Sequence, residues 1–227
     1  MSKNKSKLRW EYVTEPFDVY VNQRLVKRIH ALLEKSLTFE PEYQGYCLHL
    51  RPCVQGVDEY GAVVKYLYCT RDGRFFAHNK DGWSEKKYDF NPGKQNHKNG
   101  SVYPCIRDFG NKNCHLCVAY AWHGARPEGM VCDHLDGNKL NMHADNLQWV
   151  TTDENRRRAK IARRMRQIGL DPKLLTPTLC KGIYTLPEER IDEFIYKCSQ
   201  TFANDPSPLS AEAIRLDVAQ VLDILKQ

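Results

Sequence analysis

The sequence predicts an α+β protein with a small antiparallel sheet, a strand-loop-strand-helix unit and a C-terminal pair of helices. Three observations predict this fold class. Residues 60–107 alternate apolar, β-branched runs with turn signals, which is typical of antiparallel strands. Residues 131–158 contain two short apolar runs, expected to be strands, followed by the capped N-terminus of a helix. Residues 187–226 carry apolar side chains at helical spacing.

Residues 1–59 are expected to form a basic leader and one amphipathic helix. Val21, Leu25 and Ile29 recur every four residues, which predicts a helix over residues 20–36 that packs on the rest of the protein. Residues 38–57 mix Pro, Gly and Tyr and favour no element. The first residues lack the apolar segment of a secretory signal, and no apolar run approaches a membrane span. We therefore expect no membrane partner and a cytoplasmic location.

Residues 60–107 are expected to contain a hairpin. The run over residues 62–70 is β-branched and aromatic, Asp72-Gly73 is a turn signal, and a second run starts at Phe75. A polar loop over residues 89–101 follows, before a strand resumes over residues 102–107. Arg71 and Arg74 flank the turn, where they can be solvated or can contact a polyanion.

Polar side chains gather over residues 131–155. Asp133 and His134 are adjacent at the end of a predicted strand, and residues 147–150 predict a second strand. Thr151 with Glu154 three residues later forms a capping box, which puts Asn155 in the first turn of a helix. The expected shape is strand, long loop, strand and helix, with these polar groups on one side.

This pattern resembles the HNH endonucleases, most closely the HNH homing endonucleases of phage introns and their free-standing relatives. Residues 114–129 are similar to the helix that leads into the motif in that family, with His115 at the matching His. Met142 departs from the pattern, which usually has a second Asn there, and Cys114 and Cys117 replace aliphatic residues. The resemblance rests on Asp133, His134, Asp136-Gly137-Asn138, Asn141, Asn146-Leu147, Trp149-Val150-Thr151 and Glu154-Asn155.

The resemblance implies a metal-dependent DNA endonuclease with a ββα-metal core over about residues 100–168. Asp133 and Asn155 would give oxygen ligands to one Mg²⁺ or Mn²⁺, a hard ion that takes few protein oxygens and keeps several waters. His134 would be the general base, because an unperturbed imidazole is largely neutral at pH 7. Asn146 is implied to fix the loop or to orient His134, and His143 in the same loop can reach a phosphate.

Charge agrees with double-stranded DNA as the partner. The formal net charge is +6, and residues 1–170 hold 28 basic and 19 acidic residues, against 6 and 9 in residues 171–227. The run 155–167 has seven basic residues and no acid, and its apolar stripe can dock it on its own domain. The basic side of such a helix could also simply face solvent, or the helix could lie on an anionic membrane. The expected contacts are Arg156, Arg157, Arg158, Lys160, Arg163, Arg164, Arg71, Arg74 and His143.

Nine cysteines at irregular spacing fit reduced thiols better than a disulfide framework. Cys114 and Cys117 form a CxxC motif with Cys132 beyond it, and some HNH proteins carry a structural zinc ion. A closed zinc site usually has four ligands in two pairs. Because a second pair is missing, buried free thiols are the preferred interpretation, with structural zinc as the alternative.

Residues 169–227 change in character. Two prolines over residues 171–177 predict a linker, and helices are expected over residues 187–202 and after Ser210. These helices can pack on the nuclease core, form a homodimer or bind another partner. The expected domains are residues 1–59, 60–168 and 169–227. The alternative function is a catalytically silent DNA-binding or regulatory protein that retains the HNH fold.

Overall fold

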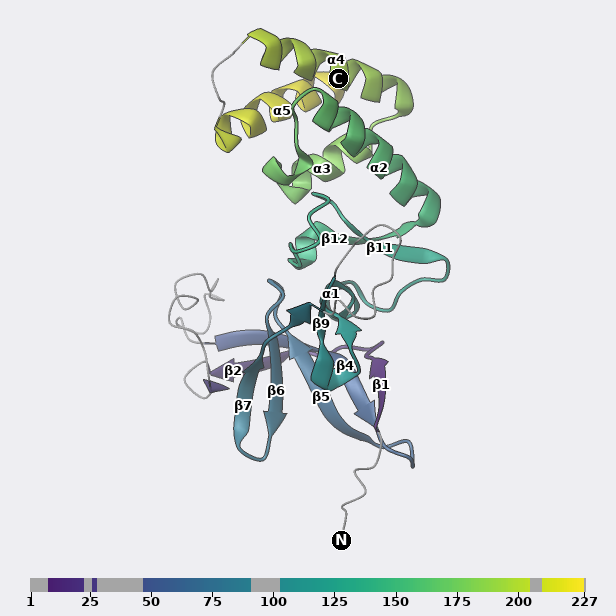
Figure 1. Ribbon diagram of the computed structural model, residues 1–227, viewed down its shortest axis with the longest axis vertical. Helices are drawn as coiled ribbons and strands as arrows, with labels where there is room; N and C mark the ends of the chain where they lie inside the picture. The colour runs from purple at the N-terminus through teal and green to yellow at the C-terminus, as the bar shows by residue number, and fades with distance from the viewer. Residues whose placement is uncertain (1–7, 23–25, 28–46, 91–102, 205–209, 227) are drawn as a thin grey trace. The chain divides into compact units, whose positions relative to one another are not determined.

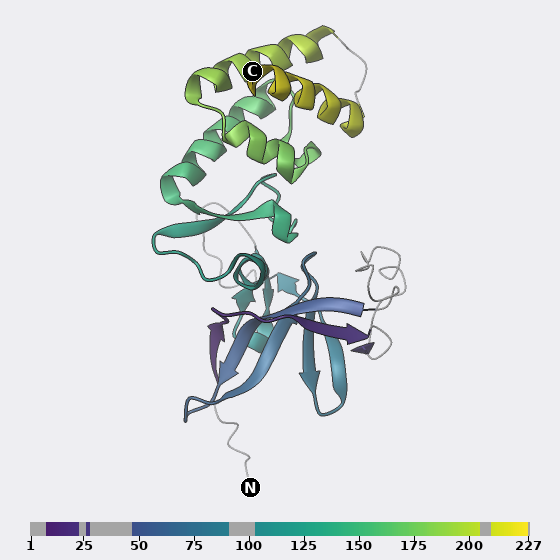
Figure 2. The same cartoon turned by 180° about the vertical axis from the view of Figure 1, so that it is seen from behind.

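The computed structural model describes residues 8–22, 26–27, 47–90, 103–204 and 210–226 of an α+β protein. Figures 1 and 2 show it from opposite sides. The chain divides into two compact units: unit 1 is Met1–Pro127 with Met142–Ala144, and unit 2 is Glu128–Asn141 with Asp145–Gln227. These units do not follow the predicted boundaries after residues 59 and 168.

Unit 1 is built mainly on antiparallel strands, and β3 pairs with β7 in parallel. The larger sheet has the order β1-β4-β5-β6-β7-β3, with β2 also paired to β4, and the smaller has the order β10-β9-β8. Helix α1 (Cys114–His123) packs against β4 and β5. The strands are β1 Arg9–Tyr12, β2 Val19–Asn22, β3 Val26–Lys27, β4 Cys47–Val57, β5 Val63–Cys69, β6 Phe75–Asn79, β7 Gly82–Lys86, β8 Asp89–Phe90, β9 Pro104–Ile106 and β10 Lys112–Asn113.

The predicted hairpin is confirmed as β5 and β6. The backbone N–H of Thr70 donates to the carbonyl of Arg74 at 2.9 Å, which closes the turn. Gly73 has φ +87°, a left-handed conformation that glycine adopts without the cost of a side chain. The Asp72-Gly73 turn signal was therefore read correctly.

The helix predicted over residues 20–36 is wrong where the structure can be compared with it. Residues 19–22 form β2, in which Val19 lies opposite Leu50 and Val21 opposite Leu48 of β4. Val21 is buried and Tyr20 is exposed, so the residues alternate as in a half-buried strand. Pairing with β4 outweighs the helical spacing; residues 28–36 lie outside the described residues.

The long strand β4 had no counterpart in the prediction. It pairs with β1, β2 and β5, so it is a central element of unit 1. Pro52 interrupts its sequence pattern, and the register with β5 shifts between Pro52 and Val54. Proline cannot donate a ladder hydrogen bond and is tolerated at such irregularities. That proline is one reason why the sequence of this segment favoured no element.

Unit 2 begins with an antiparallel hairpin that leads directly into a helix, as predicted (Figure 2). Strand β11 (Met130–His134) pairs with β12 (Leu147–Thr151), with Met130 opposite Thr151 and His134 opposite Leu147. Helix α2 (Thr152–Gln167) follows at once. Thr151 Oγ1 accepts a hydrogen bond from the backbone N–H of Glu154 at 3.1 Å, which confirms that Thr151 caps the helix.

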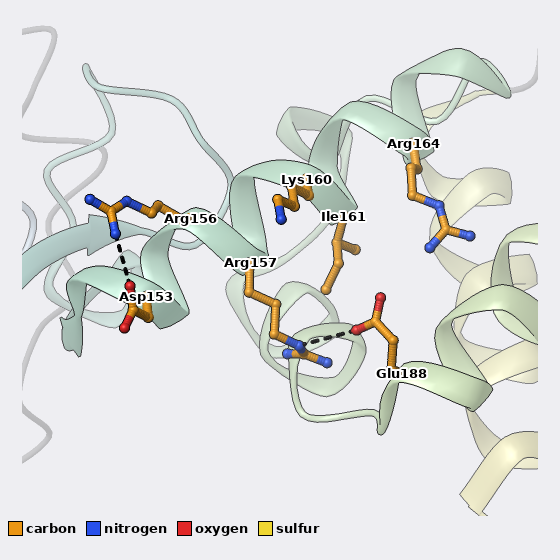
Figure 3. A pocket seen from close by; sticks show the side chains of 7 residues that line it. All are labelled: Asp153, Arg156, Arg157, Lys160, Ile161, Arg164 and Glu188. Carbon is orange, nitrogen blue, oxygen red and sulfur yellow. Dashed lines mark hydrogen bonds and ion pairs between the residues drawn. The ribbon is translucent and has the colours of Figure 1, made fainter.

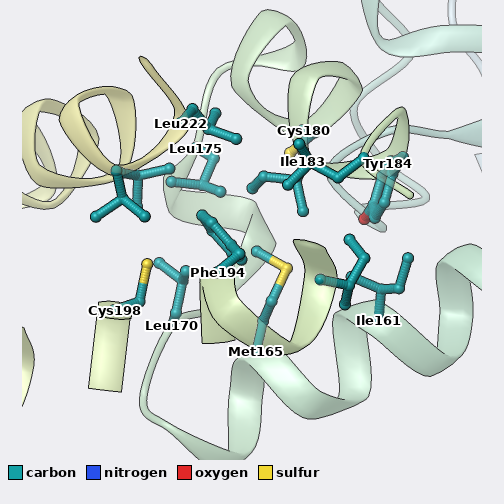
Figure 4. Close-up of a cluster of buried hydrophobic side chains, with 14 of the residues drawn as sticks. Ile161, Met165, Leu170, Leu175, Cys180, Ile183, Tyr184, Phe194, Cys198 and Leu222 are labelled. Carbon is teal, nitrogen blue, oxygen red and sulfur yellow. The ribbon is translucent and has the colours of Figure 1, made fainter. Parts of the chain in front are cut away.

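The C-terminal helices share one hydrophobic core with α2 (Figure 4). Ile161 and Met165 of α2 pack with Ile183 of α3 (Pro177–Tyr184), Phe194 of α4 (Glu188–Asn204) and Leu222 of α5 (Ala211–Lys226). The two predicted apolar stripes exist, but they are covered within unit 2. The reason for expecting a dimer through these helices is therefore removed.

Helix α3 had no counterpart in the prediction, and its first residue, Pro177, was assigned to a linker over residues 171–177. Pro177 instead occupies the first helical turn, where a missing N–H costs nothing, and Thr176 Oγ1 caps the helix by accepting from Leu179 N–H at 3.3 Å. Proline at the start of a helix and proline in a linker have the same sequence signature.

None of the described helices is long and apolar enough to cross a membrane.

Candidate functional site

The β11–β12 hairpin places the predicted site residues at the start of α2. Asp133 and His134 end β11, opposite Gln148 and Leu147 of β12. Because β12 continues into α2 with Thr151 as the cap, Asn155 lies in the first turns of that helix. Residues that are 22 positions apart (155 − 133) are thus held on one small supersecondary unit.

The carboxylate of Asp133 is bound by a buried arginine of α2. Arg158 is 6% exposed, and its Nη1 donates to Asp133 Oδ2 at 3.2 Å and to Gln148 Oε1 at 3.1 Å. Its Nε donates to Glu154 Oε1 at 2.8 Å. Burial raises the pKa of Asp133, and the Arg158 guanidinium opposes that shift. Arg158 therefore holds Asp133 in place, and its prediction as a nucleic-acid contact is wrong because its side chain faces the protein interior.

His134 is held in its neutral form. The residue is 7% exposed, and burial lowers the pKa of its imidazole to about 4 because the charged form loses hydration. The Asp136 carboxylate opposes this shift and Lys139 adds to it. At pH 7 the ring is unprotonated, which is the form that can accept a proton.

Asn146 fixes the loop between the two strands. Its Nδ2 donates to Asp136 Oδ1 at 2.8 Å and to the carbonyl of Asn141 at 3.0 Å, and its Oδ1 accepts from the backbone N–H of Asp136 at 3.1 Å. Asn146 is fully buried. Of its two predicted roles, the structure supports loop fixation. The described bonds make Asn146 a residue that positions the loop, and a part for it in catalysis stays a prediction.

We expect Asn146→Ala to destabilise unit 2 by about 1–3 kcal/mol, because the buried Asp136 carboxylate and two backbone groups lose a partner. Urea unfolding of the full chain measures this change. Leu140→Ala, an exposed position of the same loop, is the matched control and should unfold with the wild type. Equal stability of both variants would show that the loop does not depend on Asn146.

The oxygen atoms around Arg158 are of the kind that a hard cation needs. One positive group is surrounded by the oxygens of Asp133, Glu154 and Gln148, so the environment already stabilises positive charge beside Asp133. Asn155, next to Glu154, adds an amide oxygen from the same helix. Carboxylate and amide oxygens are suitable ligands for Mg²⁺ or Mn²⁺. The residues present therefore fit a divalent cation held by Asp133 and Asn155.

Comparison with protein families identifies this segment. A family model described as HNH endonuclease matches residues 112–157, from β10 into α2. The chain carries an HNH endonuclease domain. Searches of the curated proteins and of the solved structures gave no match. HNH endonucleases are nucleases that generally use a divalent metal ion, so the family and the donor set of Asp133 and Asn155 agree.

Two arginines that were predicted to contact nucleic acid have structural partners. The Arg74 side chain is 10% exposed, its Nε lies 2.9 Å from Glu85 Oε1, and its guanidinium lies over the Phe76 ring. Arg157 donates to the carbonyls of Tyr184 and Leu186 at 2.7 and 2.6 Å, which ties α2 to the segment between α3 and α4. The buried ion pair of Arg74 argues against a DNA contact, and the two hydrogen bonds of Arg157 help to hold unit 2 together.

The other predicted contacts remain accessible to different degrees. Arg71 is exposed in unit 1, with its guanidinium 5.6 Å from the centroid of the Trp122 ring. His143 is half-buried and belongs to the Met142–Ala144 part of unit 1. Arg156 and Lys160 are exposed on α2, as is Arg163, whereas Arg164 is half-buried and paired with Asp192.

One basic residue of α2 that was given no role in the sequence analysis lies close to the loop after His134. Arg166 was counted in the basic run, but no contact was assigned to it. It lies 11 residues after Asn155, which is about 20° around an α-helix and so on the same face. A Cβ placed on Gly137 would be 3.8 Å from Arg166 Nη2, so this side chain reaches the loop that follows His134. The helical period was the signal that could have identified it.

The CxxC motif belongs to the core of unit 1. Cys114 and Cys117 are fully buried, and burial raises the pKa of Cys114, which disfavours the thiolate that zinc requires. Cys132 belongs to unit 2, and burial raises its pKa to about 12. In the described ranges, no three His, Cys, Asp or Glu side chains are grouped as a metal site. The described contacts of these cysteines are those of packing residues.

Proposed function

We propose that this protein is a metal-dependent DNA endonuclease that hydrolyses phosphodiester bonds at Asp133, His134 and Asn155. The proposal is carried by the β11–β12–α2 unit, in which Asp133 and a buried, neutral His134 are consecutive residues at the end of β11 and α2 follows β12 directly. The match of residues 112–157 to the HNH endonuclease family supports it.

In the proposed reaction, His134 accepts the proton of the water that attacks phosphorus. Asp133 and Asn155 would hold the divalent cation, which stabilises the charge of the pentacoordinate transition state and of the leaving 3′ oxygen when it is bound. Arg158 orients Asp133 through its bond to Oδ2, and Asn146 keeps the loop after His134 in one conformation. The products would carry a 5′-phosphate and a 3′-hydroxyl.

The proposed nucleic-acid contacts are those basic side chains that the fold leaves accessible. Arg166 and Arg163 lie within about 80° of Asn155 around α2 and can meet the backbone that is being cut. Such contacts position a duplex without reading its sequence. The other members of the proposed set are Arg156, Lys160, Arg164, Arg71 and His143.

One HNH domain contributes one proposed site, so a single chain should nick one strand at a time. A double-strand break would need two chains or two successive events. The sequence resemblance further favours a homing-type or nicking enzyme of a phage or its bacterial host. These finer assignments rest on the motif residues between Asp133 and Asn155.

Incubation of the full chain with supercoiled plasmid tests the proposal. We expect nicked product with Mg²⁺ or Mn²⁺ and intact plasmid with EDTA, because Asp133 and Asn155 supply oxygen ligands and no positive charge of their own, so the bound cation would have to stabilise the transition state. A gel separates nicked, linear and supercoiled forms. Intact plasmid with every metal, together with DNA binding in a mobility shift, would establish the catalytically silent alternative.

A further inference from the structure

A basic groove lies along α2, at the side where α4 begins (Figure 3). It has a volume of about 370 Å³, within the range of ligand-binding clefts. Four basic residues, two acidic residues and one apolar residue line it, so its walls carry a formal charge of +2. The lining residues are Asp153, Arg156, Arg157, Lys160, Ile161, Arg164 and Glu188.

The groove faces away from the proposed catalytic residues. An α-helix turns by about 100° per residue, so Arg157, Lys160 and Arg164 lie about 140–180° around α2 from Asn155. Arg158, which binds Asp133, is also outside the lining. A phosphate in this groove would therefore be separated from the scissile phosphate by the thickness of the helix.

The charges of the groove are held in position by the fold. Arg157 is fixed by the carbonyls of Tyr184 and Leu186, and its Nε lies 3.4 Å from Glu188 Oε2. Arg156 is paired with Asp153 at 2.9 Å. Lys160 is exposed, and within the described part of the chain it has no ion pair. Lys160 is thus the cation whose charge is least compensated.

We propose that this groove is a second phosphate-binding site, which holds nucleic-acid backbone that is not being cut. The inference rests on the proposed nuclease function. It adds that the basic residues of α2 are divided between two faces of the helix. Arg163 and Arg166 serve the catalytic face, and Lys160 with Arg156 and Arg164 serves the opposite face. From Arg156 to Arg164 the helix rises about 12 Å, enough for about three successive phosphates of one strand.

Binding of a labelled random-sequence duplex to the full chain in EDTA tests the groove without cleavage. We expect Lys160→Glu to weaken binding about 3–10-fold and to lower the slope of log K against log salt by about one, as loss of one phosphate contact requires. Lys181→Glu is the matched control, since Lys181 is an exposed lysine of unit 2 outside the groove. It should change binding less than about twofold. Equal effects of the two substitutions would overturn the proposal.

Plasmid nicking with Mg²⁺ distinguishes the second site from a contact with the scissile phosphate. Lys160→Glu should raise KM and leave kcat unchanged, because the groove contributes binding that is equal in ground and transition states. A fall in kcat at unchanged KM would contradict the assignment. If the wild-type chain binds DNA and cuts none, the nuclease proposal fails, and the comparison in EDTA still decides whether the groove binds phosphate.

Discussion

Replacement of His134 by alanine should lower metal-dependent nicking of supercoiled plasmid by about 10²–10⁴-fold, the usual contribution of a general base. Burial keeps the imidazole neutral, with a pKa of about 4, so wild-type His134 is ready to accept a proton across the neutral range. DNA binding should persist, because the proposed phosphate contacts lie on other residues. Initial nicking rates and a mobility shift in EDTA measure the two effects.

His78→Ala is a suitable control for this experiment. His78 is an exposed histidine of β6 in unit 1, outside the HNH match, and its loss should leave the nicking rate near the wild-type value. Unchanged metal-dependent nicking by His134→Ala would exclude His134 as the base. Equal loss of nicking in both variants would point to contamination or to a general effect on the protein.

Replacement of Phe194 by alanine should destabilise unit 2 by about 3–5 kcal/mol, the usual cost of emptying the site of a buried aromatic side chain. Phe194 lies in α4, is fully buried, and shares a core with Ile161 and Met165 of α2. Because α2 carries Asn155 and Arg158, loosening of this core should also reduce nicking. Urea unfolding followed by circular dichroism measures the free energy of unfolding.

The matched control for Phe194 lies two positions along the same helix. Tyr196 is 65% exposed, so Tyr196→Ala should change stability by less than about 0.5 kcal/mol. Wild-type stability and nicking in Phe194→Ala would show that the core around Phe194 does not stabilise α2.

The HNH segment was the most predictable part of the chain because its signals are local. Asp133, His134 and the Thr151 cap lie within one hairpin and its adjoining helix, and the observed β11, β12 and α2 follow the predicted order. The hairpin at Asp72-Gly73 was predictable for the same reason, since its turn residues determine its conformation. The roles of Asp133, His134 and Asn155 in catalysis remain predictions.

The roles of the arginines depended on contacts distant in sequence. Nothing local distinguishes Arg158 from Arg156, yet one binds Asp133 in the interior and the other is exposed on α2. Arg157 is held by carbonyls 27 and 29 residues away, and Arg74 by Glu85 on a neighbouring strand. A basic run therefore predicts a polyanion partner more reliably than it predicts which side chains meet it.

The sequence by itself determined the α+β class, the strand-loop-strand-helix order around Asp133 and His134, and the apolar stripes of the C-terminal helices. These features depend on neighbours a few residues apart, whose spacing the chain specifies directly. Only the tertiary structure decided that residues 19–22 form a strand, that α3–α5 share a core with α2, and that Arg158 is buried beside Asp133. Burial and long-range pairing select among local preferences of similar free energy, and they are set by the whole fold.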